Sequence, residues 1–180
     1  SITSTVSDIL KNVRERGDEA LLEYTKTFDK FAVSSIDDLV VGREQMEEAL
    51  ASIGSSQREA LSEAAKRIRH YHEKQKQGSW QYQETDGSVY GQKVTPLERV
   101  GVYVPGGKAN YPSSMLMLAV PAQVAGVKEI VATVPTQPGA DGNLVFAAAA
   151  LAGVSQVFTV GGAQAIAALA YGTKTISKVD

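Results

Sequence analysis

The sequence predicts an α/β protein in which a parallel sheet follows an amino-terminal helical segment and a β-hairpin. Three observations support this fold class. Apolar residues recur at helical spacing over the first 75 residues, and the spacing changes to two between residues 80 and 94. After residue 99, strand-like and helix-like segments alternate three times. Such alternation favours right-handed strand–helix–strand units, and therefore a parallel sheet.

The helical segment is predicted to contain four helices and one short strand. Gly17 separates the first two helices, a strand is expected at residues 39–41, and a third helix at residues 44–53. Ser55 and Ser56 are candidate N-caps of a long fourth helix that ends near Gln75. The first two helices each carry apolar residues on one face: Val6, Ile9, Leu10 and Val13 in the first, and Ala20, Leu21, Tyr24 and Phe28 in the second. The fourth helix is expected to bury Leu61, Ala64, Ala65, Ile68 and Tyr71.

A β-hairpin is predicted between Trp80 and Val94. Trp80, Tyr82 and Val89 alternate with polar residues on either side of Asp86-Gly87. An Asp-Gly pair between two alternating runs is a strong signal of a tight hairpin turn.

The carboxyl-terminal part is predicted to contain three strands and three helices. A helix is expected to begin near Pro112, and Pro121, which has no N–H, is expected to interrupt or kink it. The strands are predicted at residues 100–104, 129–134 and 156–160, and the two further helices at residues 144–151 and 163–171.

Composition narrows the classes of function. The net charge of −2 does not favour nucleic acid as a partner, because nucleic-acid binding requires a strongly basic face. The absence of cysteine excludes disulfides and thiolate metal sites. No apolar run reaches the roughly 20 residues of a membrane helix, and no signal peptide opens the sequence, so a cytoplasmic protein is expected.

Two glycine turns are the candidate ligand-binding loops. Gly106 and Gly107 follow the first predicted strand, and Gly161 and Gly162 follow the third. Ligands of open parallel sheets bind at the carboxyl ends of the strands, where free N–H groups of a helix start attract anions. The alternative is that the glycines only shape tight turns. Neither loop matches the G-x-G-x-x-G fingerprint or the P-loop motif.

Three polar residues beside these turns are further candidates. Gln164 lies in the first turn of an otherwise apolar helix, where its amide would bind a ligand or a neighbouring loop. Tyr103, at the end of the first strand, would stack on a ligand or pack in the core. Ser113, like Ser114, would bind a substrate or cap the helix start.

The residue pattern alone suggests no catalytic base, no nucleophile and no metal site. His70 and His72 are spaced i, i+2 and so point to different faces of a helix, whereas a helical zinc pair needs i, i+3 or i, i+4. We expect both to be solvated or partly packed.

Several long motifs resemble the histidinol dehydrogenase family. They are 13–21 (VRERGDEAL), 99–107 (RVGVYVPGG), 111–117 (YPSSMLM), 120–130 (VPAQVAGVKEI) and 160–173 (VGGAQAIAALAYGT). The resemblance covers essentially the whole chain. It implies incomplete Rossmann-like domains and an NAD- and zinc-dependent homodimer that oxidises L-histidinol, through L-histidinaldehyde, to L-histidine.

The resemblance also implies roles for residues and for segments. Tyr103 and Gln164 would contact NAD, Gly106, Gly107, Gly161 and Gly162 would contribute more weakly, and Ser113 would face the substrate. Residues 1–96 would form a helical arm with a hairpin, and residues 97–180 part of an NAD-binding domain. Family members are much longer, so we expect an amino-terminal fragment that lacks the zinc ligands and the Glu-His pair and is inactive alone.

Two other functions are compatible with the same sequence. A related NAD-dependent dehydrogenase of another small polyol would share this half, because this half would hold the nucleotide more than the substrate. A non-enzymatic module could instead self-associate through an unpaired edge of the sheet.

Overall fold

A four-stranded sheet lies at the centre of the computed structural model, which describes residues 1–106, 111–136 and 142–180. Its strand order is β1-β6-β5-β4. The strands β4 (Arg99–Tyr103), β5 (Glu129–Thr133) and β6 (Gln156–Phe158) are parallel. The predicted parallel sheet is therefore confirmed for these strands, and β1 (Val40–Val41) adds an antiparallel edge beside β6.

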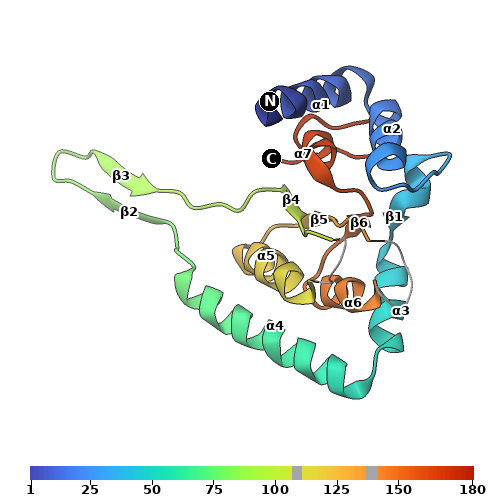
Figure 1. Cartoon of the computed structure of the whole chain (residues 1–180). Helices are drawn as coiled ribbons and strands as arrows, with labels where there is room; N and C mark the ends of the chain where they lie inside the picture. Colours follow the sequence, from blue (N-terminus) through green and yellow to red (C-terminus); the bar gives the residue numbers. More distant parts are fainter. Residues whose placement is uncertain (107–110, 137–141) are drawn as a thin grey trace.

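Helices cover both faces of this sheet (Figure 1). Side chains of a strand point alternately to opposite faces. On β5, Ile130 and Ala132 accordingly join one hydrophobic cluster, and Val131 joins the other. The first cluster packs α3 (Arg43–Ser52), α4 (Ser55–Gln75), α5 (Pro112–Ala125) and α6 (Asn143–Leu151) onto the sheet. The second packs α1 (Ile2–Arg16), α2 (Asp18–Phe28), the 3₁₀ turn η1 (Ile36–Leu39) and α7 (Gly162–Tyr171).

Both clusters contain residues from either side of position 96. Met46 of α3 and Met115 of α5 belong to one cluster, and Leu21 of α2 and Leu169 of α7 belong to the other. The division into residues 1–96 and 97–180 stays a prediction.

The antiparallel hairpin of β2 (Trp80–Gln83) and β3 (Val89–Gln92) projects away from the body of the molecule (Figure 1). Tyr82 pairs with Tyr90 in its register, and the turn contains Gly87, as the Asp-Gly signal predicts. Every residue of both strands is exposed.

Three expectations about the helices are corrected. The N-cap of α4 is Gly54, so neither Ser55 nor Ser56 caps it; the side chain of Gln57 instead accepts a hydrogen bond from the Gly54 N–H. The side chain of Tyr71 is 63% exposed, because α4 extends beyond the helices it packs against. The helix α5 continues through Pro121 without interruption, since its apolar residues are held against the sheet on both sides of the proline.

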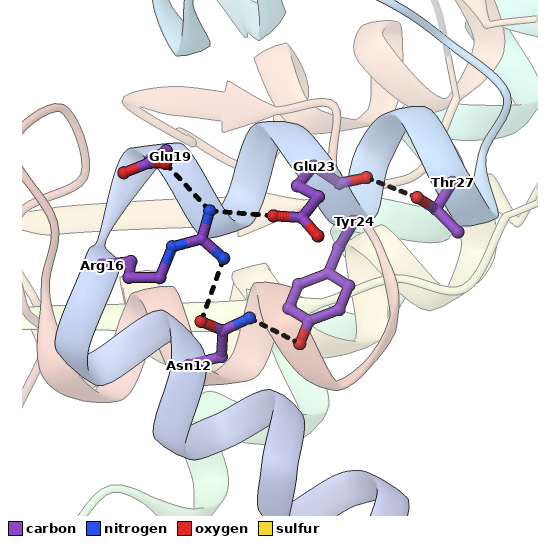
Figure 2. A network of polar contacts seen from close by, with 6 residues as sticks. All are labelled: Asn12, Arg16, Glu19, Glu23, Tyr24 and Thr27. Atoms are coloured by element: carbon purple, nitrogen blue, oxygen red, sulfur yellow. Dashed lines mark hydrogen bonds and ion pairs between the residues drawn. The ribbon is translucent and has the colours of Figure 1, made fainter.

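A polar network holds the first two helices together (Figure 2). The guanidinium of Arg16 lies 2.9 Å from Glu19 and 2.8 Å from Glu23, and these carboxylates raise its pKa above the usual value. Arg16 also donates to Asn12, whose amide donates to the Tyr24 hydroxyl over 2.9 Å. The network lies on the surface and links α1 to α2.

The carboxyl-terminal segment packs back against α2 and against the first residues of β4. Asp18 accepts hydrogen bonds from the backbone and the hydroxyl of Thr175, at 3.1 and 2.8 Å. The carboxylate of Asp180 accepts from the backbone N–H groups of Glu98 and Arg99, both at 3.0 Å. These contacts hold the carboxyl-terminal segment against the start of α2 and against the start of β4.

Candidate functional site

The candidate site lies where the three parallel strands end. Tyr103, Thr133 and Phe158 occupy the same level of β4, β5 and β6 in the sheet register. The loops that follow these strands therefore leave from one edge of the sheet. This is the edge at which open parallel sheets bind ligands.

Tyr103 connects the two predicted glycine turns. Its ring is half-buried and packs against the second hydrophobic cluster, and its hydroxyl accepts a hydrogen bond of 3.1 Å from the backbone N–H of Gly162. The side chain thus reaches from the end of β4 to the start of α7. Both alternatives weighed for the ring, ligand contact and core packing, are compatible with this half-buried position.

The amino terminus of α7 is open toward this edge. Its N-cap Gly161 is extended, no side chain caps the helix, and its first turn contains no acidic residue. The first N–H groups of a helix have no partner inside the helix, and they carry a partial positive charge. Tyr103 occupies one of them, so the N–H groups that follow Gly162 are the anion-attracting part of the turn.

The glycines of both turns are also required by packing. A Cβ on Gly106 would lie 2.9 Å from Cγ of Pro135, and a Cβ on Gly161 would lie 2.6 Å from Cβ of the same proline. Gly162 has a φ of +68°, a conformation that favours glycine. Shape alone therefore explains these three glycines, and their contact with a ligand stays a prediction. Gly107 lies outside the described residues.

Pro135 and Thr136 are site-edge residues that the sequence reasoning did not propose. Pro135 directly follows the strand predicted at residues 129–134, and it lies against both Gly106 and Gly161. A proline that directly follows a buried parallel strand was the available signal. Together these residues place the loop after β5 against the loops after β4 and β6.

Gln164 is buried, with 2% of its surface exposed, although it is polar. Its amide folds back over the glycine turn: its Oε1 lies 2.5 Å from the position that a Cβ of Gly162 would take. The structure thus places the Gln164 amide beside Gly162, whose N–H donates to the hydroxyl of Tyr103.

The hydroxyl of Thr133 is a buried polar group at the same edge of the sheet, without a hydrogen-bond partner among the described residues. It is fully buried, and within the part of the chain that the structure describes its Oγ1 has no hydrogen-bond partner. Thr133 follows Val131 by two residues, and therefore points to the same face of the sheet as Tyr103 and α7. An unpaired buried hydroxyl costs stability, which is typical of a position where a bound molecule or water completes the bonding.

Ser113 and Ser114 lie in the first turn of α5, also after β4. The N-cap of this helix is Tyr111, so the expectation that a serine caps it is wrong. Ser113 is exposed, and Ser114 is half-buried. An exposed hydroxyl at a helix start near this edge is compatible with the substrate-side role predicted for Ser113.

The histidines lie far from this edge, on α4. His70 is exposed, and the Nδ1 of His72 lies 2.7 Å from the Oε1 of Gln75. Among residues 1–106, 111–136 and 142–180, no group of three or more His, Asp or Glu side chains could hold a metal ion. In the same residues, no helix is both long and apolar enough to cross a bilayer.

The topology and the strand-end loops together define a Rossmann-like α/β protein. The profile of one family, described as histidinol dehydrogenase, matches residues 1–180. The chain belongs to the histidinol dehydrogenase family.

Individual relatives agree with this assignment. The chain is 62% identical to the histidinol dehydrogenase of Pseudomonas savastanoi pv. phaseolicola over 180 residues, which are 100% of this chain and 40% of that protein. It is 56% identical to the histidinol dehydrogenase of Hydrogenovibrio crunogenus, with 100% of this chain and 42% of the relative covered. The chain spans about 40% of the length of the curated relatives it matches.

A solved structure confirms the fold. The crystal structure of histidinol dehydrogenase from Elizabethkingia anophelis superposes with a TM-score of 0.89 at 32% identity, over 100% of this chain and 41% of that chain. The helical layers and the mixed sheet are therefore shared with a solved member of the family.

Proposed function

We propose that this chain supplies the nucleotide-binding part of a histidinol dehydrogenase, which oxidises L-histidinol through L-histidinaldehyde to L-histidine. Membership of the family supports the reaction. One structural observation carries the nucleotide-binding role: Tyr103, Thr133 and the Gly161–Gly162 turn meet at the carboxyl edge of the parallel strands.

The residues at this edge fit a dinucleotide. The open start of α7 would attract a phosphate, and the buried Gln164 amide beside it would bond to a ribose or amide group. The half-buried face of Tyr103 would pack against the ligand, and the orphaned Thr133 hydroxyl would gain a partner. NAD, when bound, supplies the acceptor of a hydride. These residues bind and orient it, and Ser113 would lie toward the substrate.

Zinc, which the family resemblance implies, does not fit the residues that the structure describes. The described residues include no cluster of three metal-binding side chains. The two histidines lie on α4, away from the strand ends. No step of the reaction is therefore assigned to a metal held by this chain, and we expect the 180 residues alone to form no NADH from L-histidinol. NADH production by the pure chain would contradict this expectation.

A titration of the ¹⁵N-labelled chain with NAD tests the nucleotide-binding proposal. We expect amide shifts concentrated at Gly106, Thr133, Gly161 and Gly162, because these residues surround the strand ends. Amides that stay unshifted at millimolar NAD, or shifts confined to the far side of the sheet, would refute the proposal.

A pair of glutamine variants sharpens the test. Gln164→Glu keeps the size of the side chain but places a negative charge beside the phosphate position, so we expect NAD affinity to fall by about tenfold or more. Gln81→Glu makes the same amide-to-carboxylate change on the exposed hairpin, and it should leave the NAD affinity unchanged. Equal affinities in the two variants would remove Gln164 from the site.

A further inference from the structure

The second parallel strand, β5, is followed by a tight turn. The N–H of Thr136 donates to the carbonyl of Val134 over 2.7 Å, and a hydrogen bond between residues two apart defines a γ-turn around Pro135. Proline suits the centre of this turn, because its ring holds φ at about −65°. The chain therefore changes direction directly after the strand.

This turn places Thr136 against the glycine loop that follows β4. The Oγ1 of Thr136 lies 2.8 Å from the position that a Cβ of Gly106 would take, so its hydroxyl is beside the backbone of that glycine. The side chain of Thr136 is half-buried. It is thus held by its neighbours while part of its surface stays accessible to a ligand.

Two other hydroxyl groups near the strand ends are committed elsewhere. Thr159, directly after β6, is buried, and its hydroxyl donates to the carbonyl of Leu39 over 2.9 Å. The hydroxyl of Tyr103 accepts from the N–H of Gly162 and therefore serves the start of α7. Thr136 instead brings a hydroxyl to the loop after β4.

The strand order makes the position of Thr136 comparable with that of a ribose-binding residue. In dinucleotide-binding sheets, the first strand–helix turn carries glycines beside the pyrophosphate, and an acidic residue after the second strand bonds to the ribose 2′-hydroxyl of NAD. The unit β4–α5–β5 has Gly106 after its first strand and Thr136 after its second. The contact between these two residues shows that the two positions meet, although the acidic residue is replaced by a threonine.

We propose that Thr136 binds the 2′-hydroxyl of the adenosine ribose of NAD, an inference that rests on the proposed nucleotide-binding function. A threonine hydroxyl and a ribose hydroxyl can each donate and accept, so they form a hydrogen bond in either direction. A carboxylate at the same place only accepts, and its charge repels the 2′-phosphate of NADP. Thr136 therefore contributes one neutral hydrogen bond to NAD and no charge against NADP.

A ribose at Thr136 agrees with a phosphate at the start of α7. Pro135 lies against both Gly106 and Gly161, so the loop beside Thr136 and the turn before α7 flank one proline. A ribose adjoins each phosphate of a dinucleotide. A ligand with its phosphate at the start of α7 would therefore extend its ribose across Pro135 to Thr136.

A cycle that removes the hydroxyl from the residue, from the ligand and from both tests this contact. The affinity of the ¹⁵N-labelled chain is measured by titration with NAD and with NAD that lacks the adenosine 2′-hydroxyl. Loss of the ligand hydroxyl should weaken binding to the wild type by about three- to tenfold, the equivalent of one neutral hydrogen bond. Thr136→Val should weaken NAD binding by the same factor and should bind the two ligands equally.

Two further variants separate this contact from a purely structural role of Thr136. Thr136→Ser keeps the hydroxyl and should keep the preference for the ligand with the 2′-hydroxyl. Thr95→Val makes the valine substitution at an exposed residue of the segment before β4, beside the end of α5 that is remote from the strand ends. It should leave both affinities at their wild-type values.

A charge variant tests the same contact with a second ligand. Thr136→Asp should raise the ratio of NAD affinity to NADP affinity by about tenfold or more, because the new carboxylate repels the 2′-phosphate. An unchanged ratio, or equal losses on removal of the ligand hydroxyl in the wild type and in Thr136→Val, would overturn this inference and leave nucleotide binding intact. A chain that binds no NAD would refute the nucleotide-binding proposal itself, and this inference with it.

Discussion

At the scale of single residues, the candidate site depends on one side chain and one backbone conformation. The Tyr103 hydroxyl binds the N–H of Gly162, and Gly162 has a φ of +68° that lets α7 begin directly after the turn. Gln164 then folds back over this turn. Tyr103, Gly162 and Gln164 therefore form one unit, and a substitution at any of them should disturb the positions of the other two.

Gly162→Ala tests this unit. A left-handed conformation costs a non-glycine residue about 1–2 kcal/mol, and the new Cβ would also lie 2.5 Å from Oε1 of Gln164. We expect the free energy of unfolding, measured by chemical denaturation, to fall by about 1–3 kcal/mol.

Gly78→Ala is the matched control. No atom lies within 4 Å of the position of its Cβ, and its φ is not positive. The free energy of unfolding should therefore stay within about 0.5 kcal/mol of the wild type, or rise slightly. Equal losses in the two variants would show that Gly162 is not conformationally constrained.

At the scale of elements, the turn between α3 and α4 is fixed by an arginine. The guanidinium of Arg58 donates to the carbonyls of Leu50, Ala51 and Ile53 at 3.1, 2.9 and 3.3 Å. The last carbonyls of a helix have no partner within it, so this side chain satisfies the end of α3. The contact sets the direction in which the long helix α4 leaves the body.

Arg58→Ala should lower the free energy of unfolding by about 1–2 kcal/mol, because three carbonyls lose a charged donor. Arg67→Ala, on the same helix, removes only an exposed ion pair with Glu63 at 2.8 Å. This variant should change the free energy of unfolding by less than about 0.5 kcal/mol. Urea denaturation of both variants measures the difference. A larger effect of Arg67 than of Arg58 would contradict this account of the turn.

The helix α5 shows how packing overrides a local signal. Pro121 cannot donate to the carbonyl of Met117, yet the helix runs from Pro112 to Ala125. Met117 is 59% exposed, whereas Leu116 and Val120 are buried in the cluster that packs the helix on the sheet. Burial of these apolar residues outweighs one lost hydrogen bond.

At the scale of the whole molecule, the segment after α7 is bound to the start of α2, near the other end of the chain. The carboxylate of Asp18, at the start of α2, accepts hydrogen bonds from the backbone N–H and the hydroxyl of Thr175. The two residues are 157 positions apart in the sequence. The segment after α7 is thereby held against the helical layer formed by α1 and α2.

Asp18→Ala should lower the free energy of unfolding by about 1–3 kcal/mol, because two partly buried hydrogen bonds to a carboxylate are lost. Amide hydrogen exchange should also become faster at Thr175 and Ile176. Asp8→Ala, at an exposed position of α1, is the control and should change neither quantity. Unchanged protection of Thr175 in the Asp18 variant would mean that other contacts hold the segment.

The sequence by itself determined which segments form helices and strands and where the glycine turns lie. Hydrophobic spacing and turn residues act over a few positions, so the break at Gly17, the hairpin and the three strand–helix units could all be predicted. The resemblance of the motifs correctly indicated the family. The residue pattern alone could not, because it defines only an α/β protein with two glycine turns.

Only the tertiary structure decided which of these segments meet. The antiparallel place of β1 beside β6, the wedge of Pro135 between two glycines and the bond from Tyr103 to Gly162 join residues far apart in sequence. The spacing of apolar residues within a segment carries no information on such contacts. The exposure of Tyr71 and the continuity of α5 through Pro121 also depend on neighbouring elements. The physical reason is that burial is a property of the packed whole, whereas periodicity and turn chemistry belong to each segment.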